Sequence, residues 1–460
     1  MAENGSRASA SERIGATGQQ EPATPPGPDG YPVLGNVLDL ADDAFAFYQS
    51  LAGHGDVARY RVFGTEGYAV THPDAIREVL VDDHGRYCKG EMPADQLGSL
   101  LGDGLFLAEG EAWETQRQAM QPAFFRKQVE RYGDSVVDHA RTVADGWADG
   151  DVVAIDEAAS TLTLRVLAAT LLGIDADAER ETVRRAAAAI TERYDTARLG
   201  SYLPEWLPTP ANRRYRRSLD ELHDLVDRLV AERRAGGGPE REDLLSMLVS
   251  AADAGAFDDE TLRGNVVTFL FAGHETTALG LTYTLYLLAQ HPDTQQRLQA
   301  QLDEVLEGED PTPETLRSLP LLDAVVDEAL RLYPPVYTFF REPTEDVTLR
   351  GYRVPEGSVI SLPQCAVHRD ERWWDAPDSF RPERWLDEGS DRPEYAYFPF
   401  GGGPRHCIGM RFARLELRLA VATLLDRLAF DAVTESLSLV ASANARPAEP
   451  VRLRVRDRCQ

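Results

Sequence analysis

The chain has 460 residues, of which 43% are hydrophobic and 27% are charged, so its composition is that of a globular protein. These values exclude a disordered, collagen-like or disulfide-rich chain. The 76 acidic residues outnumber the 48 lysines and arginines, and the resulting net charge of −28 disfavours binding to nucleic acid or to an anionic membrane surface.

Only two of the basic residues are lysines, Lys89 and Lys127, and the others are arginines. An acidic surface with almost no lysine suits concentrated salt, in which counterions screen the repulsion between carboxylates. GC-rich codon usage would also replace lysine by arginine, but it does not account for the acidic excess. We therefore expect the source to be a halophilic archaeon.

The chain has four widely spaced cysteines: Cys88, Cys365, Cys407 and Cys459. They form no CxxC or zinc-binding pattern, as in a protein of a reducing cytosol, and we expect a cytoplasmic location. Residues 1–24 are small and polar, which predicts a flexible tail and contains no apolar stretch of a signal peptide. We expect a single domain over residues 25–460.

Alternation of apolar and polar residues at 59–70 predicts two strands, after which helical periodicity dominates the chain. The stretch 266–288 is apolar enough to be considered as a membrane span. His274 and Glu275 interrupt it, and ionisable groups are unfavourable at the centre of a bilayer. We therefore predict a buried core helix here and no membrane anchor.

After residue 330 the pattern changes to short β-like segments at 346–354 and 358–362, followed by a long irregular stretch at 372–399. A final helix is predicted from Ile408 to about Leu428. The sequence thus predicts a mainly α fold with a small β component, built around one core.

The strongest motif is FGGGPRHCIG at residues 400–409. It places Cys407 at the start of a helix, after a glycine-rich turn whose backbone N–H groups are expected to lower the pKa of the thiol. The glycines allow the backbone to approach something large and flat, to which Arg405 offers a cation. From these residues alone, the cysteine could be a nucleophile, a metal ligand or a structural thiol.

This segment resembles the haem-binding loop of the cytochrome P450 family, FxxGxRxCxG, at every fixed position. The resemblance implies the cytochrome P450 fold, with a long central oxygen-binding helix and haem b (iron protoporphyrin IX) held between two helices. It also implies that Cys407 is the axial thiolate ligand of the haem iron, that Phe400 packs against this ligand and that Arg405 binds the haem.

A second motif, AGHETT at residues 272–277, lies in the apolar helix. Gly273 weakens the helix locally, and the acid Glu275 beside the hydroxyl of Thr276 suggests a proton relay. The motif is similar to the family's [AG]GxETT segment, which implies that Thr276 holds the oxygen complex and that Glu275 supplies protons through water. A zinc protease with HExxH is excluded, because residue 278 is alanine.

Glu328 and Arg331 are three residues apart on a predicted helix and could pair, although such pairs are common on protein surfaces. Together with FRPERW at residues 380–385 they match the family's ExxR and PERF-like motifs, with Trp385 in place of the more usual phenylalanine. The resemblance implies that Glu328, Arg331 and Arg384 lock the irregular stretch to the core. No role beyond packing is predicted for His368.

Trp113 and Arg117 lie four residues apart on a predicted helix, so both could donate to one carboxylate. They match the family's WxxxR motif, which implies that they hold a haem propionate. Arg341 stands at the position of a further propionate partner in the family.

The resemblance implies a monooxygenase that inserts one oxygen atom from O2 into an apolar small molecule such as a fatty acid, a terpenoid or a carotenoid. The sequence carries no flavin, nicotinamide or iron–sulfur signature, so we expect a separate, ferredoxin-type electron donor with its reductase. Two alternatives remain: a peroxide-using or isomerising haem-thiolate enzyme, and a haem-based sensor or ligand carrier.

Family position predicts that residues 91–104, 194–210 and 335–339 line the substrate pocket. A basic docking surface for the electron donor is predicted from two groups of cations. They are Arg411, Arg414 and Arg418 on the last helix, and Arg126, Lys127 and Arg131. The alternative is that these arginines only pair with neighbouring carboxylates such as Glu130 and Glu416.

Overall fold

We analysed a computed structural model of the chain. The structure describes residues 23–90, 97–174, 176–195, 197–198, 200, 203–236, 243–387 and 391–458. Most of the predicted tail, residues 1–22, lies outside the described residues. Ala23, at its end, forms a parallel β-bridge with Tyr352.

Helices form most of the molecule. They are α1 (Val37–Asp42), α2 (Ala44–Ala52), α3 (Pro73–Arg77), α5 (Gly110–Met120), α6 (Arg126–Glu130), α7 (Gly133–Asp145), α8 (Ile155–Leu167), α9 (Ala176–Tyr194), α10 (Pro210–Arg234), α11 (Leu244–Asp253), α12 (Asp259–Ala272), α13 (His274–Gln290), α14 (Pro292–Leu306), α15 (Pro320–Leu332), α16 (Gln364–Val367) and α17 (Met410–Arg427). The prediction of a mainly α fold is confirmed.

The strands are short. They are β1 (Val57–Val62), β2 (Thr65–Val70), β3 (Tyr87–Cys88), β4 (Val152–Ala154), β5 (Phe339–Pro343), β6 (Val347–Leu349), β7 (Tyr352–Val354), β8 (Val359–Leu362), β9 (Leu428–Ala432), β10 (Leu439–Ala441), β11 (Ala445–Pro447) and β12 (Arg452–Asp457). The two strands predicted within 59–70 are the hairpin β1–β2. The sequence analysis missed β5, because FFREP does not alternate between apolar and polar residues.

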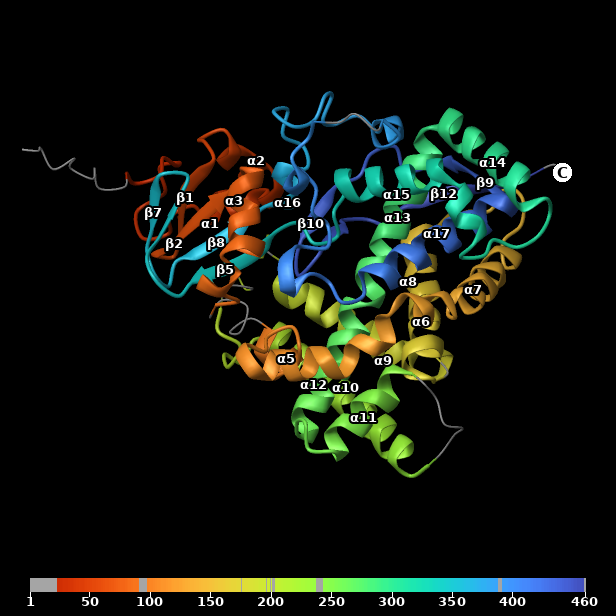
Figure 1. Ribbon diagram of the computed structural model, residues 1–460, viewed down its shortest axis with the longest axis horizontal. Helices are drawn as coiled ribbons and strands as arrows, with labels where there is room; N and C mark the ends of the chain where they lie inside the picture. The colour runs from red at the N-terminus through yellow and green to blue at the C-terminus, as the bar shows by residue number, and fades with distance from the viewer. Residues whose placement is uncertain are drawn as a thin grey trace, which may run out of the picture.

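The largest sheet has five strands in the order β1-β2-β8-β5-β3. Figure 1 shows this sheet with α1, α2 and α3 on the left, and the helical part of the molecule on the right and below. The remaining sheets are β4-β12-β9, β10-β11 and β6-β7. The parallel pairing of β2 with β8 joins the N-terminal hairpin to the segment that precedes the irregular stretch.

The buried apolar residues form three clusters rather than the single core predicted. The largest lies among the helices from α5 to α17, and two smaller ones lie against the N-terminal sheet. The difference arises because a sheet and its flanking helices bury their own apolar faces against one another.

The predicted central helix is two helices, α12 and α13, which meet at Gly273. A Cβ atom at Gly273 would lie 2.5 Å from the Leu167 side chain of α8 and 2.8 Å from the Phe269 carbonyl oxygen. Glycine is therefore required here for close packing of this helix on α8. In the described part of the chain, no helix has the length and apolar character needed to span a membrane.

The Glu328 carboxylate is fully buried and forms an ion pair with Arg331, which is also fully buried. Both hydrogen bonds of this pair measure 2.8 Å, and Arg384 Nε donates to the same carboxylate at 3.0 Å. The indole N–H of Trp385 donates to Glu328 Oε2 at 2.9 Å. These contacts bind the irregular stretch to α15. Most glutamate–arginine pairs at this spacing lie on the protein surface, but this one is fully buried.

His368 extends this network towards the cysteine loop. Arg331 Nη1 donates to the His368 carbonyl oxygen at 2.8 Å, and the Phe398 backbone N–H donates to His368 Nε2 at 3.0 Å. Burial, together with the nearby Arg331 charge, lowers the pKa of His368 to about 3, so its ring is a neutral hydrogen-bond acceptor at physiological pH. His368 therefore does more than pack, since it fixes the backbone two residues before Phe400.

We expect the substitution Trp385→Phe to lower the free energy of unfolding by about 1.5 kcal/mol, because a buried carboxylate loses one hydrogen-bond donor. Urea unfolding measures the change. The matched control is Trp373→Phe, since Trp373 Nε1 is a buried group without a hydrogen-bond partner in the described structure. Equal losses in the two variants would show that the indole hydrogen bond to Glu328 contributes nothing.

Candidate haem-binding site

The cysteine loop connects the irregular stretch to α17. Gly401 and Gly403 have φ angles of 73° and 63°, a left-handed conformation that favours glycine. A Cβ atom at Gly403 would overlap the Leu80 carbonyl oxygen, and one at Gly402 would lie 2.5 Å from the Tyr395 ring. These glycines thus serve close contacts within the protein, and the expectation that the loop admits a flat ligand stays a prediction.

The Cys407 side chain is exposed, and its backbone N–H donates to the Phe400 carbonyl oxygen at 2.9 Å. The thiol is accessible to solvent, yet many protein atoms lie around it and partly desolvate it. This desolvation raises the pKa of the thiol, while the Gly409 backbone N–H and the Arg117 charge act in the opposite direction. The prediction of a lowered pKa is therefore wrong for the protein alone, because the loss of solvent outweighs the backbone N–H groups.

The central helix lies beside this loop. The Phe124 ring stacks on Phe269 of α12 at 5.5 Å between centroids, and a Cβ atom at Gly409 would lie 3.8 Å from Phe124. Residues 264–271 are all buried, yet Ala272, which follows them, is exposed. Ala272 and Cys407 are thus solvent-accessible positions on the central helix and on the cysteine loop.

A cluster of cations lies next to the loop. Arg341 is 7% exposed, and burial and the neighbouring Arg405 lower its pKa to about 10. Burial and the charges of Arg341 and Arg405 also lower the pKa of Lys89 well below its usual value. The charge of Glu109 raises the pKa of all three cations. Three cations with this shared acidic neighbour suit a further anionic group.

Arg405 forms an ion pair with Glu109 and donates to the Ala108 carbonyl oxygen at 2.8 Å. Arg341 donates to the Phe340 carbonyl oxygen at 2.7 Å. The sequence analysis missed Lys89 as a member of this cluster. Its only signal was its rarity, as one of two lysines in the chain.

Trp113 and Arg117, on α5, both reach the cysteine loop but do not share a carboxylate of the protein. The Arg405 guanidinium lies 4.8 Å from the Trp113 ring centroid. Arg117 donates to the His406 carbonyl oxygen at 2.9 Å and contacts His406 Nε2 at 3.3 Å. Phe400 is half-buried, and Arg414 lies 5.5 Å from its ring centroid.

The two predicted relay residues are engaged with other protein groups. The Thr276 hydroxyl donates to the Ala272 carbonyl oxygen at 2.6 Å. Glu275 forms an ion pair with Arg446, with 3.1 Å between Oε1 and Nε. The sequence analysis missed Arg446, which lies 171 positions further along the chain, outside any motif.

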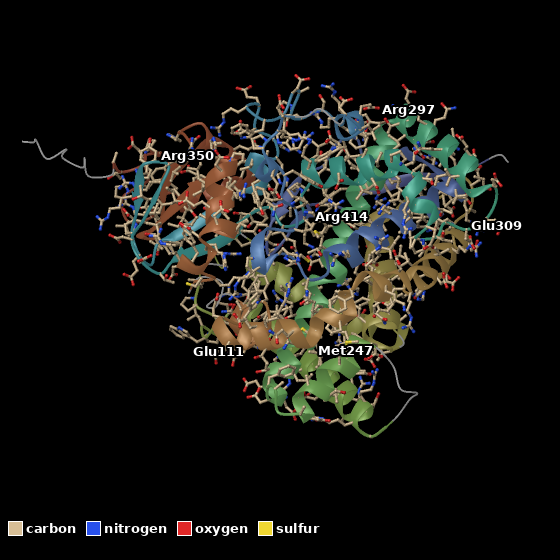
Figure 2. The ribbon with its side chains drawn as sticks, in the orientation of Figure 1. Glu111, Met247, Arg297, Glu309, Arg350 and Arg414 are labelled. Carbon is tan, nitrogen blue, oxygen red and sulfur yellow. The ribbon has the colours of Figure 1, made fainter. Side chains whose placement is uncertain are left out.

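The predicted basic surface is only partly available. Arg414 forms an ion pair with Asp327 at 2.6 Å, Arg418 with Asp323, and Arg126 with Glu130 at 2.9 Å. Figure 2 labels Arg414 near the middle of the molecule. Acidic residues of α15 thus neutralise two of the three arginines of α17, and the docking surface itself stays a prediction.

Part of the predicted pocket lining, residues 91–96, 196, 199 and 201–202, lies outside the described residues. Leu100 is buried in the main core, and Leu203 is 40% exposed. The Phe339 ring lies 3.5 Å from a Cβ atom built at Gly401, so this pocket segment adjoins the cysteine loop.

Comparison with known proteins identifies the family. The family model for cytochrome P450 matches residues 25–442. Pentalenene oxygenase of Streptomyces avermitilis is 36% identical over 410 residues, which cover 87% of this chain and 90% of the relative. Cyclooctat-9-en-7-ol 5-monooxygenase of Streptomyces melanosporofaciens is 37% identical, with coverages of 87% and 88%.

A human relative, cytochrome P450 3A5, is 31% identical over 471 residues, with coverages of 94% of this chain and 91% of the relative. These relatives do not bear on the expected halophilic source, which stays a prediction. The family match spans both the sheet and the helical part, and it includes the cysteine loop and the motif at 272–277. The chain belongs to the cytochrome P450 family, and it is a haem b-dependent oxidoreductase of the monooxygenase type.

Proposed function

We propose that the protein inserts one oxygen atom from O2 into a terpenoid-like small molecule, using electrons from a separate ferredoxin-type donor and its reductase. The observation that carries the proposal is the accessible thiol of Cys407 in a loop bordered by buried cations. The names of two relatives, pentalenene oxygenase and cyclooctat-9-en-7-ol 5-monooxygenase, support a terpenoid substrate. Fatty acids and carotenoids are the alternative substrate classes.

The donor set fits haem b. Cys407 would bind the iron, and Phe400 would pack beside that ligand. The haem carboxylates would be held by Arg405, Arg341, Arg117 and Trp113, to which we add Lys89. When bound, the haem supplies the activation of oxygen.

The protein's own part in the reaction is to move protons. In the proposed relay, Glu275 takes a proton from solvent at its carboxylate and passes it through a water molecule to Thr276. The Thr276 hydroxyl lies in a hydrogen bond within the helix, so it must turn from the Ala272 carbonyl oxygen to serve the relay.

Substrate class is tested by spectroscopic titration of the purified holoenzyme. We expect cyclic terpenoid hydrocarbons and alcohols to shift the haem spin state at concentrations at least tenfold lower than fatty acids of the same carbon number. The reverse order would point to a fatty-acid hydroxylase. Turnover that ran on peroxide but never on O2 with an electron donor would favour the peroxide-using alternative.

Replacement of the thiol tests the ligand assignment. We expect Cys407→Ser to retain the fold but to lose the strongly red-shifted Soret band of the reduced carbon monoxide complex, and to lose monooxygenation. Cys365→Ser, at a buried cysteine of α16, is the control and should keep both properties. A Cys407→Ser protein with an unchanged spectrum would rule out Cys407 as the axial ligand.

We propose that the electron donor docks near Arg411 and Lys127. Both side chains are exposed, and α17, which carries Arg411, is in contact with α6, which carries Lys127. A cationic surface next to the cysteine loop attracts an acidic donor and shortens the path of the electron. In concentrated salt this attraction is largely screened.

Charge reversal at both positions, Arg411→Glu with Lys127→Glu, is expected to slow reduction by an acidic ferredoxin about tenfold at low salt, with a smaller effect at high salt. Stopped-flow reduction kinetics give the rates. The double reversal Arg61→Glu with Arg452→Glu, at exposed arginines of β1 and β12, serves as the charge-matched control. Unchanged kinetics in the double variant would place the docking surface elsewhere.

A further inference from the structure

Two buried amide side chains join the central helix to the segment that precedes α5. Asn265, on α12, is inaccessible to solvent, and Gln116, on α5, is 3% exposed. Asn265 Oδ1 accepts a hydrogen bond from the Leu105 backbone N–H at 2.8 Å, and Asn265 Nδ2 donates to Gln116 Oε1 at 3.0 Å. Gln116 Nε2 donates in turn to the Asp103 carbonyl oxygen at 2.8 Å. The two amides thus form one series of hydrogen bonds that starts and ends on the same backbone segment.

The orientation of both amides follows from the two ends of this series. A backbone N–H can only donate, so the oxygen of Asn265 faces Leu105. A carbonyl oxygen can only accept, so the nitrogen of Gln116 faces Asp103. Between them, the nitrogen of Asn265 meets the oxygen of Gln116. Removal of either side chain would leave a buried polar group of the other without this partner, which is unfavourable.

Close backbone contact also fixes this segment against the central helix. A Cβ atom at Gly264 of α12 would lie 2.4 Å from the Leu101 carbonyl oxygen. A Cβ atom at Gly104 would lie 2.9 Å from the backbone of Gly264. A side chain at either position would force the segment away from α12. The helix therefore sets the position of the segment both by packing and by the hydrogen bond from Asn265.

The other end of the segment contacts the cation cluster of the candidate haem site. We call residues 103–109 the linking segment. Arg405 Nη1 donates to the Ala108 carbonyl oxygen at 2.8 Å, and Arg405 also forms its ion pair with Glu109. The Lys89 backbone N–H donates to Glu109 Oε1 at 2.8 Å. Two of the groups that orient the Arg405 guanidinium therefore belong to the linking segment.

The Glu109 carboxylate is not held in place by burial. Its side chain is 42% exposed, whereas that of Arg405 is 16% exposed. Water competes for an exposed carboxylate, so such an ion pair is weak unless its partners are already aligned. The backbone provides this alignment, since the N–H groups of Leu107 and Ala108 both donate to the Gly104 carbonyl oxygen at 3.0 Å. This turn connects the residues held by the amides directly to Ala108 and Glu109.

We infer that Asn265 and Gln116 are positioning residues that align Arg405 with a haem carboxylate by holding the linking segment. The inference rests on the proposed binding of haem b, in which Arg405 is one of the cations that hold the haem carboxylates. An aligned guanidinium binds a carboxylate strongly and neutralises its charge. This slows the loss of haem, and it favours the reduced state of the iron, which carries one more negative charge.

The experiment interrupts the series of hydrogen bonds at each amide in the holoenzyme. Gln116→Met keeps the shape of the side chain without its hydrogen bonds, and Asn265→Ser is a second variant at the other amide. Each variant should lose haem to excess apomyoglobin at least fivefold faster than the wild type. Each should also have a more negative reduction potential, because Arg405 is less well aligned.

The matched control is Gln295→Met. Gln295 is a glutamine of α14 that is 4% exposed, and its amide exchanges two hydrogen bonds with the backbone of Phe430 in β9. The control should be destabilised in urea, as a buried amide is lost, but it should keep the wild-type rate of haem loss and the wild-type potential.

A double variant separates positioning from general stability. If the amides act through Arg405, Gln116→Met should shift the potential in the wild-type background and add no further shift to Arg405→Gln. An effect on stability alone would not depend on the residue at position 405, so the two changes would add. Asn265→Ser combined with Arg405→Gln should give the same result as the first double variant.

The outcomes distinguish the inference from the function on which it rests. If Arg405→Gln leaves the haem loss rate and the potential unchanged, the assignment of Arg405 to a haem carboxylate is wrong. If Arg405→Gln has its effect but Gln116→Met and Asn265→Ser match the wild type, the positioning role is overturned. Additive shifts in the double variants, or an equal effect of Gln295→Met, would also overturn it. Either amide variant decides the question if the other does not fold.

Discussion

The buried carboxylate of Glu328 is the constraint on which the haem-binding part of the molecule depends. It accepts five hydrogen bonds, from Arg331, Arg384, Trp385 and the backbone of Arg381. A buried charge must be compensated fully, so these donors hold the irregular stretch in one conformation. Through the His368 carbonyl and ring, the same network reaches Phe398 and thereby sets where the cysteine loop begins.

The charge beside the cysteine loop is positive, whereas the chain as a whole is strongly negative. The protein carries a net charge of −28, yet Lys89, Arg341 and Arg405 are gathered beside the loop with Glu109 as their shared acidic neighbour. Burial lowers the pKa of all three, and repulsion by neighbouring cations lowers it further for Lys89 and Arg341, an effect that an anionic group would relieve. Binding of the haem carboxylates and folding of this region should therefore stabilise each other.

Sequence reasoning located the residues that lie within short motifs and missed those that depend on distant contacts. Cys407 and Arg405 are two positions apart, so the one motif that carries the family resemblance contains both. Arg117 and His406 are 289 positions apart, and only the fold brings them together. The i, i+3 spacing of Glu328 and Arg331 predicted a pair but not its burial, because helical periodicity does not show which face of α15 the irregular stretch covers.

Glu328 and Glu275 are both paired with arginine, but they differ in the number of hydrogen-bond donors and in the access of water. Glu328 is inaccessible to solvent and has five donors, so releasing it would break several hydrogen bonds to a buried charge. Glu275 is held by an ion pair with Arg446, whose side chain is 29% exposed and also contacts Thr191 on α9. Water can reach the Arg446 side of that ion pair, so the pair is screened more than the buried contacts of Glu328. The number of donors and the access of water therefore distinguish a fully compensated structural charge from an ion pair that solvent can reach.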